Sequence, residues 1–171
     1  FDFSDKVVMF AADGMRPDLV DRYADKGLLP EMDDLMDDGL KGRNGMLQAF
    51  PPNTGVGWAS LATGAWPSSH GSTNNTFHRT GDAFNNTTSF ATPGILQADT
   101  LLQSAERAGK TVVAVEWVAA RGLVPALQGP VIDFRTFIGG RGIALNFDLP
   151  GQPALANSFS VQYQRQELAA A

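Results

Sequence analysis

A proline-rich turn that runs into a short helix of small residues, within residues 50–71, constrains this chain most. Prolines precede the expected helix and Gly64 follows it, so the helix is predicted to begin at Thr54 or Gly55 and to end near Gly64. Thr54 is thereby expected at a helix N-terminus. Unpaired N–H groups and the positive end of the helix dipole favour a phosphate there, or an oxygen that gains negative charge.

The hydroxyl of Thr54 has two interpretations at this position. Threonine is a common N-cap, because its side-chain oxygen accepts an N–H of the first helical turn. The same hydroxyl can also serve as a nucleophile, and Gly55 and Gly57 leave room for a ligand to approach the backbone beside it. Ser60 is an alternative nucleophile by residue type, but it falls inside the helix and is interpreted as packed.

A second informative stretch lies upstream, where the apolar run of residues 7–12 ends in Asp13 and Gly14. Such a run is typical of a buried parallel strand that carries a carboxylate at its C-terminal edge. Open α/β sheets bind their ligands at that edge. Asp13 is therefore a candidate site residue.

Several motifs occur in an order that resembles the alkaline phosphatase superfamily and, within it, the type I phosphodiesterase/nucleotide pyrophosphatase family. The similar segments are D-G-M-R from Asp13, L-P-E-M-D-D-L-M-D-D-G at 29–39, F-P followed by Thr54, and L-A-T-G-A-W-P-S-S-H-G at 61–71. The resemblance covers roughly the first two-thirds of the chain, and several motifs in order are more specific than any one of them.

The resemblance implies two divalent metal ions, usually zinc, and a phosphothreonine intermediate. It makes Thr54 the nucleophile and a metal ligand, and it makes Asp13 a ligand of one metal. The backbone N–H groups of Thr54 and Gly55 are expected to assist the developing negative charge. The implied activity is hydrolysis of phosphodiester or pyrophosphate bonds in nucleotides.

Two departures from the family pattern bear on this interpretation. Many members have an asparagine three residues beyond the nucleophile, where this chain has Gly57. Asn53, Asn74 or Asn75 are the candidates for that phosphate contact. The chain also has only two histidines and lacks the family's downstream ligand motifs, so we expect it to be the N-terminal portion of a longer enzyme that is inactive as this piece alone.

The order of predicted elements indicates an α/β fold with a doubly wound, mostly parallel sheet of the alkaline phosphatase type. Apolar residues at helical spacing, followed by glycine, predict amphipathic helices. The expected helices after the first strand are 17–26, 31–38 and 98–108, and further strands are expected at 40–49 and 111–117. Residues 72–94 are polar and are expected to form a long binding or mobile loop.

The character of the sequence changes after Gly122. Short β-like runs at 131–137, 143–147 and 158–164 are separated by turn residues. We therefore expect residues 1–122 to form the N-terminal part of a catalytic domain and residues 123–168 to form a β-rich insertion or cap. Residues 169–171 look like a vector-derived tail.

Composition limits the classes of partner. The net charge of −5 argues against a nucleic-acid backbone, and a small phosphate ester or nucleotide is the expected partner. No apolar run reaches the length of a membrane span. The absence of cysteine excludes disulfides and the usual Cys-dependent sulfatases. The alternatives are a phosphomonoester or phosphonate hydrolase of the same superfamily, or a non-catalytic anion-binding module. Only the family resemblance favours an extracytoplasmic location.

Overall fold

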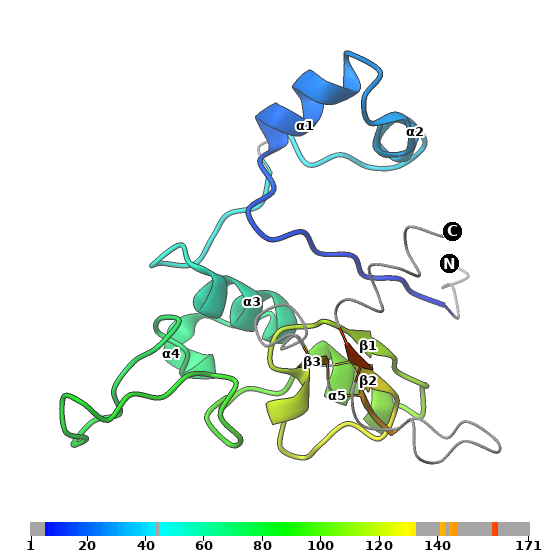
Figure 1. The fold of residues 1–171 in the computed structure, drawn as a ribbon. Coiled ribbons are helices and arrows are strands. Elements are labelled where there is room, and N and C mark those ends of the chain that lie inside the picture. The colour runs from blue at the N-terminus through cyan, green and yellow to red at the C-terminus, as the bar shows by residue number, and fades with distance from the viewer. Residues whose placement is uncertain (1–5, 44, 133–140, 143, 147–158, 161–171) are drawn as a thin grey trace. The chain divides into compact units, whose positions relative to one another are not determined.

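Two units make up the chain, Phe1–Leu47 and Gln48–Ala171, and each is described by itself (Figure 1). The structure is a computed structural model that describes residues 6–43, 45–132, 141–142, 144–146 and 159–160. The expected tail at 169–171 lies outside these residues. The expected domain boundary after Gly122 stays a prediction.

The first unit contains two short helices, α1 (Pro17–Ala24) and α2 (Pro30–Asp38). Each begins with proline, whose fixed φ suits the first helical turn and whose missing N–H is not needed there. Ala24 is buried at the end of α1, and Gly27 adopts a φ of 68° just beyond it. The two helices predicted from apolar spacing are confirmed.

Helix α2 buries less of its apolar surface than predicted. Apolar spacing predicts that Met32, Leu35 and Met36 face inward; Met32 and Met36 are half-buried, but Leu35 is 74% exposed, so its predicted position is wrong. Residues four apart share a face of a helix, but Leu35 lies about 100° around the axis from Met36. The acidic residues of α2 are exposed, as expected for a solvated surface: Asp33, Asp34, Asp37 and Asp38.

Two strands predicted in the first part of the chain are not formed. Residues 7–12 are extended but pair with no described segment, and Val8 is 94% exposed. The described part of 40–49 is likewise unpaired, and Leu47 is exposed. An apolar run supplies the side chains of a buried strand, but a strand also needs a hydrogen-bonding neighbour. No described residue supplies that neighbour for these two segments.

The second unit begins with α3 (Thr54–Thr63), which the sequence predicted with nearly these bounds. Gly64 ends the helix in the left-handed conformation with a φ of 63°, which glycine adopts at little cost. A single-turn helix, α4 (Pro67–His70), follows directly.

Helix α5 (Leu101–Arg107) begins three residues later than the predicted Ala98. Thr100 and Gln103 form a capping box there, in which each side chain bonds the other residue's backbone N–H. Gln103 is buried, and its Nε2 also donates to the carbonyl of Pro125 at 2.9 Å. The Thr-x-x-Gln spacing was a visible start signal in the sequence.

A small mixed sheet follows α5. The strand predicted at 111–117 contains β1 (Ala114–Val115), which pairs in parallel with β2 (Val131–Ile132). Strand β2 pairs in antiparallel fashion with β4 (Ala144–Leu145), and β3 (Arg141–Gly142) does so with β5 (Phe159–Ser160). The parallel pair and the helices define an α/β protein. Apart from Asn146, which follows β4, the remaining residues of the β-like runs at 131–137, 143–147 and 158–164 lie outside the described residues.

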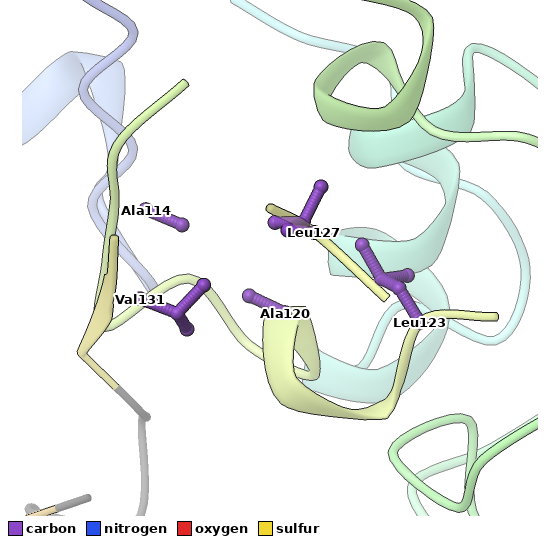
Figure 2. Close-up of a cluster of buried hydrophobic side chains, with 5 residues drawn as sticks. All are labelled: Ala114, Ala120, Leu123, Leu127 and Val131. Carbon is purple, nitrogen blue, oxygen red and sulfur yellow. The ribbon is translucent and has the colours of Figure 1, made fainter. Parts of the chain in front are cut away.

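The connection between β1 and β2 contains a 3₁₀ turn, η1 (Ala120–Gly122), and folds back over the parallel pair. Small and aliphatic side chains from the two strands and this connection form one core cluster (Figure 2). Its buried members are Ala114, Ala120, Leu123, Leu127 and Val131. The sheet and its connection therefore share one apolar interior.

A second core cluster packs helix α3 against the residues that follow β1 and against Phe90. Ala59 of α3 is fully buried against Phe90, Val118 and Ala119. Beside them, the ring of Trp58 meets Trp117 edge to face, with centroids 4.9 Å apart. These contacts hold the helix whose first residue is the candidate nucleophile.

The Glu106 carboxylate of α5 fixes the chain that leads into β2. Its oxygens accept the backbone N–H groups of Gln128 and Gly129 at 2.8–3.0 Å. Hydrogen bonds to a charged acceptor are stronger than neutral ones. The bonds explain why an acidic residue is tolerated near a helix C-terminus, which otherwise disfavours negative charge. No helix in the described residues is both long and apolar enough to cross a membrane.

Candidate active site

Thr54 is the first residue of α3 and is half-buried, but it does not cap the helix. The cap is Asn53, whose Oδ1 accepts the N–H of Val56 at 3.2 Å. Within the residues that the structure describes, neither the N–H nor the hydroxyl of Thr54 has a hydrogen-bond partner. The capping interpretation of Thr54 is corrected, and its hydroxyl is left open for chemistry.

The room expected beside Gly55 is filled by the loop that follows α4. The N–H of Gly55 donates to Asn75 Oδ1 at 2.6 Å, and Ser72 Oγ donates to the Gly55 carbonyl at 3.2 Å. A Cβ on Gly55 would lie 2.7 Å from the carbonyl oxygen of Asn74. This glycine therefore admits the protein's own loop, and its N–H is engaged in this structure. Similarly, a Cβ on Gly57 would meet the Gln48 side chain at 2.9 Å.

Three asparagine side chains gather at the start of α3, and their hydrogen bonds fix how each amide points. Asn75 Oδ1 faces the Gly55 N–H, and Asn53 Oδ1 faces the Val56 N–H. Asn53 Nδ2 then donates to Asn74 Oδ1 at 2.7 Å, which also accepts the N–H of Asn75. Since backbone N–H groups only donate, these oxygens are assigned by chemistry. The Nδ2 groups of Asn74 and Asn75 remain as donors with no partner among the described residues.

A buried histidine supports the helix from the other side. His70, at the end of α4, is fully buried. Its Nδ1 accepts the N–H of Ser72 at 3.1 Å, so Nε2 carries the proton and donates to Ser60 Oγ at 2.9 Å. In this tautomer His70 cannot take a proton from Ser60. Ser60 is thus a packed hydroxyl, as interpreted from the sequence, and both ring nitrogens of His70 are used within the protein.

Stability should depend on pH through His70. Burial lowers the pKa of His70 below its ordinary value, since the charged ring is poorly solvated and its Nδ1 would face the N–H of Ser72 as a second donor. The unfolded chain then binds the proton more readily than the folded chain. We expect the free energy of unfolding to be constant above about pH 6.5 and to fall below it, by at most about 1.4 kcal/mol per pH unit from this group.

Urea unfolding between pH 7.5 and 5 measures this dependence. His70→Gln should reduce the slope below pH 6.5, while His78→Gln, at an exposed position, should retain it. An identical slope in wild type and His70→Gln would contradict the prediction.

Asp13, the candidate metal ligand, belongs to the first unit. It is exposed in a turn that follows residues 7–12, and the next residue, Gly14, has a φ of 69°. The structure thus brings together the other candidate residues at the start of α3. They are Thr54, Gly55, Asn53, Asn74 and Asn75.

The described residues contain no group of three His, Cys, Asp or Glu side chains that could hold a metal ion. The ring nitrogens of His70 are already bonded. His78 stacks on Phe84 at 5.2 Å, and its Nδ1 is 3.2 Å from the carbonyl of Asn86. These residues do not by themselves complete the ligand set of a dinuclear site.

The loop of residues 72–94 carries contacts that sequence reasoning missed. Ser72 is fully buried, and Phe77 pairs with Thr88 through two backbone hydrogen bonds. Each contact depends on the conformation of the loop and joins residues that are more than ten positions apart. No local pattern announces them.

The start of α3 thus presents the Thr54 hydroxyl, which has no hydrogen-bond partner in the described chain, near the side-chain amides of Asn53, Asn74 and Asn75. A comparison with family models matches residues 7–136 to type I phosphodiesterase / nucleotide pyrophosphatase, and the chain belongs to this family. The family hydrolyses phosphodiester and pyrophosphate bonds, so the chain is a hydrolase at that level. No curated protein and no solved structure matches the chain.

Proposed function

We propose that this chain supplies the nucleophile, Thr54, for hydrolysis of phosphodiester or pyrophosphate bonds of nucleotides through a covalent intermediate. The observation that carries the proposal is the hydroxyl of Thr54 at the first position of α3, which has no partner in the described part of the chain because Asn53 supplies the cap. A threonine that capped its own helix would have its oxygen engaged with a backbone N–H. Membership of the phosphodiesterase family supplies the reaction class.

The proposed reaction has two displacement steps. Thr54 Oγ attacks phosphorus, a new Oγ–P bond forms, and the bond to the leaving oxygen breaks. The proton of the hydroxyl ends on the leaving alcohol or phosphate. Water then attacks the same phosphorus, the Oγ–P bond breaks, and the threonine hydroxyl is restored.

The start of α3 offers several groups to the negative phosphoryl oxygens. The N–H of Thr54 has no partner in the described chain, and the positive end of the helix dipole lies at the same point. We propose the free Nδ2 groups of Asn74 and Asn75 as further donors, in place of the family asparagine that is Gly57 here. Gly55 takes part through its position only, since its N–H is held by Asn75.

The family resemblance implies two divalent metal ions, which we propose to be zinc. Asp13 and Thr54 are the residues of this chain that we propose as ligands, by the donor chemistry of a carboxylate and an alkoxide. When bound, such ions stabilise the nucleophile and the leaving oxygen. The described residues do not complete the ligand set, and the steps above assign no role to a metal. We further propose the division into a catalytic part at 1–122 and a β-rich insertion or cap at 123–168.

Trapping of the covalent intermediate tests the proposal. The full-length protein is mixed with bis(p-nitrophenyl) phosphate and Zn²⁺, quenched in acid, digested and analysed by mass spectrometry. We expect a nitrophenyl phosphoryl group on Thr54. Turnover of p-nitrophenyl phosphate but not of the diester would favour the phosphomonoesterase alternative. Phosphate binding without metal, with no adduct on any residue, would favour the anion-binding module and overturn the proposal.

A further inference from the structure

We propose that Ser72 and Asn75 are positioning residues that form a clamp on Gly55 and thereby set the place of the Thr54 hydroxyl. This inference rests on the proposed function of Thr54 as nucleophile. It assigns the loop after α4 a part in the reaction that is separate from contact with the substrate.

The clamp grips both backbone groups of Gly55. Asn75 Oδ1 accepts the N–H at 2.6 Å, and Ser72 Oγ donates to the carbonyl at 3.2 Å. Gly55 and Ser72 are buried, so water does not readily replace the bond between them, whereas Asn75 is exposed and its bond to the Gly55 N–H is partly buried. Because Gly55 directly follows Thr54, any shift of its N–H moves the peptide group that carries the threonine.

Close packing removes the remaining freedom at this point. A Cβ on Gly55 would lie 2.7 Å from the carbonyl oxygen of Asn74 and 2.9 Å from the Cα of Asn75. The loop backbone therefore lies directly against the helix. The start of α3 cannot move toward the loop without a clash, nor away from it without breaking the two hydrogen bonds.

The clamp is itself anchored on both sides. The N–H of Ser72 donates to His70 Nδ1, and the other ring nitrogen of His70 bonds Ser60 one and a half turns further along α3. On the other side, Asn74 Oδ1 accepts both the N–H of Asn75 and the amide of Asn53. The loop is thus attached at the N-cap, the first turn and the middle of α3.

Nucleophilic attack depends strongly on such placement. The reacting atoms must approach within about 3–3.5 Å in line, and a misplacement of about 1 Å costs on the order of 100-fold in rate. A side chain that holds the nucleophile should therefore affect kcat more than KM. A side chain that only contacts substrate should affect KM.

The N–H of Gly55 gives a readout that does not require activity. It is the second amide of α3, a position with no acceptor inside the helix, so Asn75 is the partner that protects it from exchange with solvent. Asn75→Ala should accelerate hydrogen exchange at Gly55. Asn75→Asp keeps an acceptor oxygen of the same shape and should preserve the protection. Asn85→Ala, an exposed asparagine of the same loop, should leave Gly55 unchanged.

Kinetics of the full-length protein with bis(p-nitrophenyl) phosphate complete the test. We expect Asn75→Ala to lower kcat by about 10- to 100-fold. Loss of the Nδ2 donor proposed for Asn75 should raise KM by a smaller factor. Asn75→Asp should restore most of kcat while its negative charge raises KM. Ser72→Ala should change kcat in the same direction as Asn75→Ala.

Two outcomes would overturn the clamp. One is Gly55 exchange unchanged in Asn75→Ala, and the other is a rise of KM with kcat unchanged in that variant. Failure of the proposed function is recognised separately, because Thr54→Ala would then keep its activity while the exchange result at Gly55 still reports on the clamp.

Discussion

Thr54→Ala is expected to lower kcat/KM for bis(p-nitrophenyl) phosphate by at least about 1,000-fold, since it removes the only atom proposed to bond phosphorus. Thr54→Ser keeps a hydroxyl at the first position of α3 and should retain activity within about 100-fold. The fold should tolerate both changes, because the Thr54 hydroxyl has no hydrogen-bond partner in the described chain and Asn53 caps the helix. Steady-state kinetics and thermal unfolding of both variants measure these effects.

Ser60→Ala is the matched control for this experiment. Ser60 lies on the same helix and carries the same chemical group, but its oxygen receives a hydrogen bond from His70. We expect it to lose less than about tenfold in activity and to be destabilised by about 1 kcal/mol, the cost of one buried hydrogen bond. Loss of activity in Ser60→Ala with activity retained in Thr54→Ala would exchange the two roles and contradict the proposed nucleophile.

Gly129→Ala is expected to be the most destabilising of the glycine-to-alanine substitutions in the second unit. A Cβ at Gly129 would lie 1.9 Å from the carbonyl oxygen of Val112, which is a backbone atom and cannot turn away. The chain would have to separate where β1 and β2 pair, and the N–H of Gly129 would lose its bond to Glu106. We expect a loss of about 3 kcal/mol or more in the free energy of unfolding, and a melting temperature roughly 6–12 °C lower.

Two other glycines separate the steric cause from the general effect of adding a methyl group. Gly42→Ala places its Cβ no closer than 3.8 Å to another residue and should change the free energy of unfolding by less than about 0.5 kcal/mol. Gly109→Ala meets no atom within 4 Å but has a φ of 74°, so it should cost about 1–2 kcal/mol through backbone strain alone. Equal effects at all three glycines would contradict the steric argument.

Local signals predicted the helices well. Prolines at the first position of α1 and α2 and the glycines after these helices indicated the bounds of both, and Gly64 indicated the end of α3. The sequence left the role of Thr54 open, because Asn53 and Thr54 are both good caps and a difference of one residue decides which of them lies outside the helix. That difference is what releases the Thr54 hydroxyl.

Pairing between distant segments was much less predictable. The apolar run at 7–12 has the composition of a buried strand but has no partner among the described residues, whereas β1 and β2 pair across the turn η1. Composition indicates whether a segment could be buried, but it does not indicate which segment it pairs with in a sheet. The family motifs pointed to Thr54, and Asn53, Asn74 and Asn75 were candidates only because Gly57 replaces the family asparagine. The hold of Asn75 on Gly55 joins residues 20 apart, so it became visible only in the structure.

The antiparallel bridge between Phe77 and Thr88 divides the loop into two parts with different tolerance for insertions and deletions. Between His70 and Asn75, the residues His70, Ser72, Asn74 and Asn75 all bond fixed partners, so a chain one residue longer or shorter there would lose several bonds at once. Residues 78–87 form the loop that the bridge closes. The entropic cost of closing a loop grows slowly with its length, by about 0.6 kcal/mol for each doubling. Natural variants of this protein should therefore differ in length at 78–87 and keep the spacing from His70 to Phe77 constant.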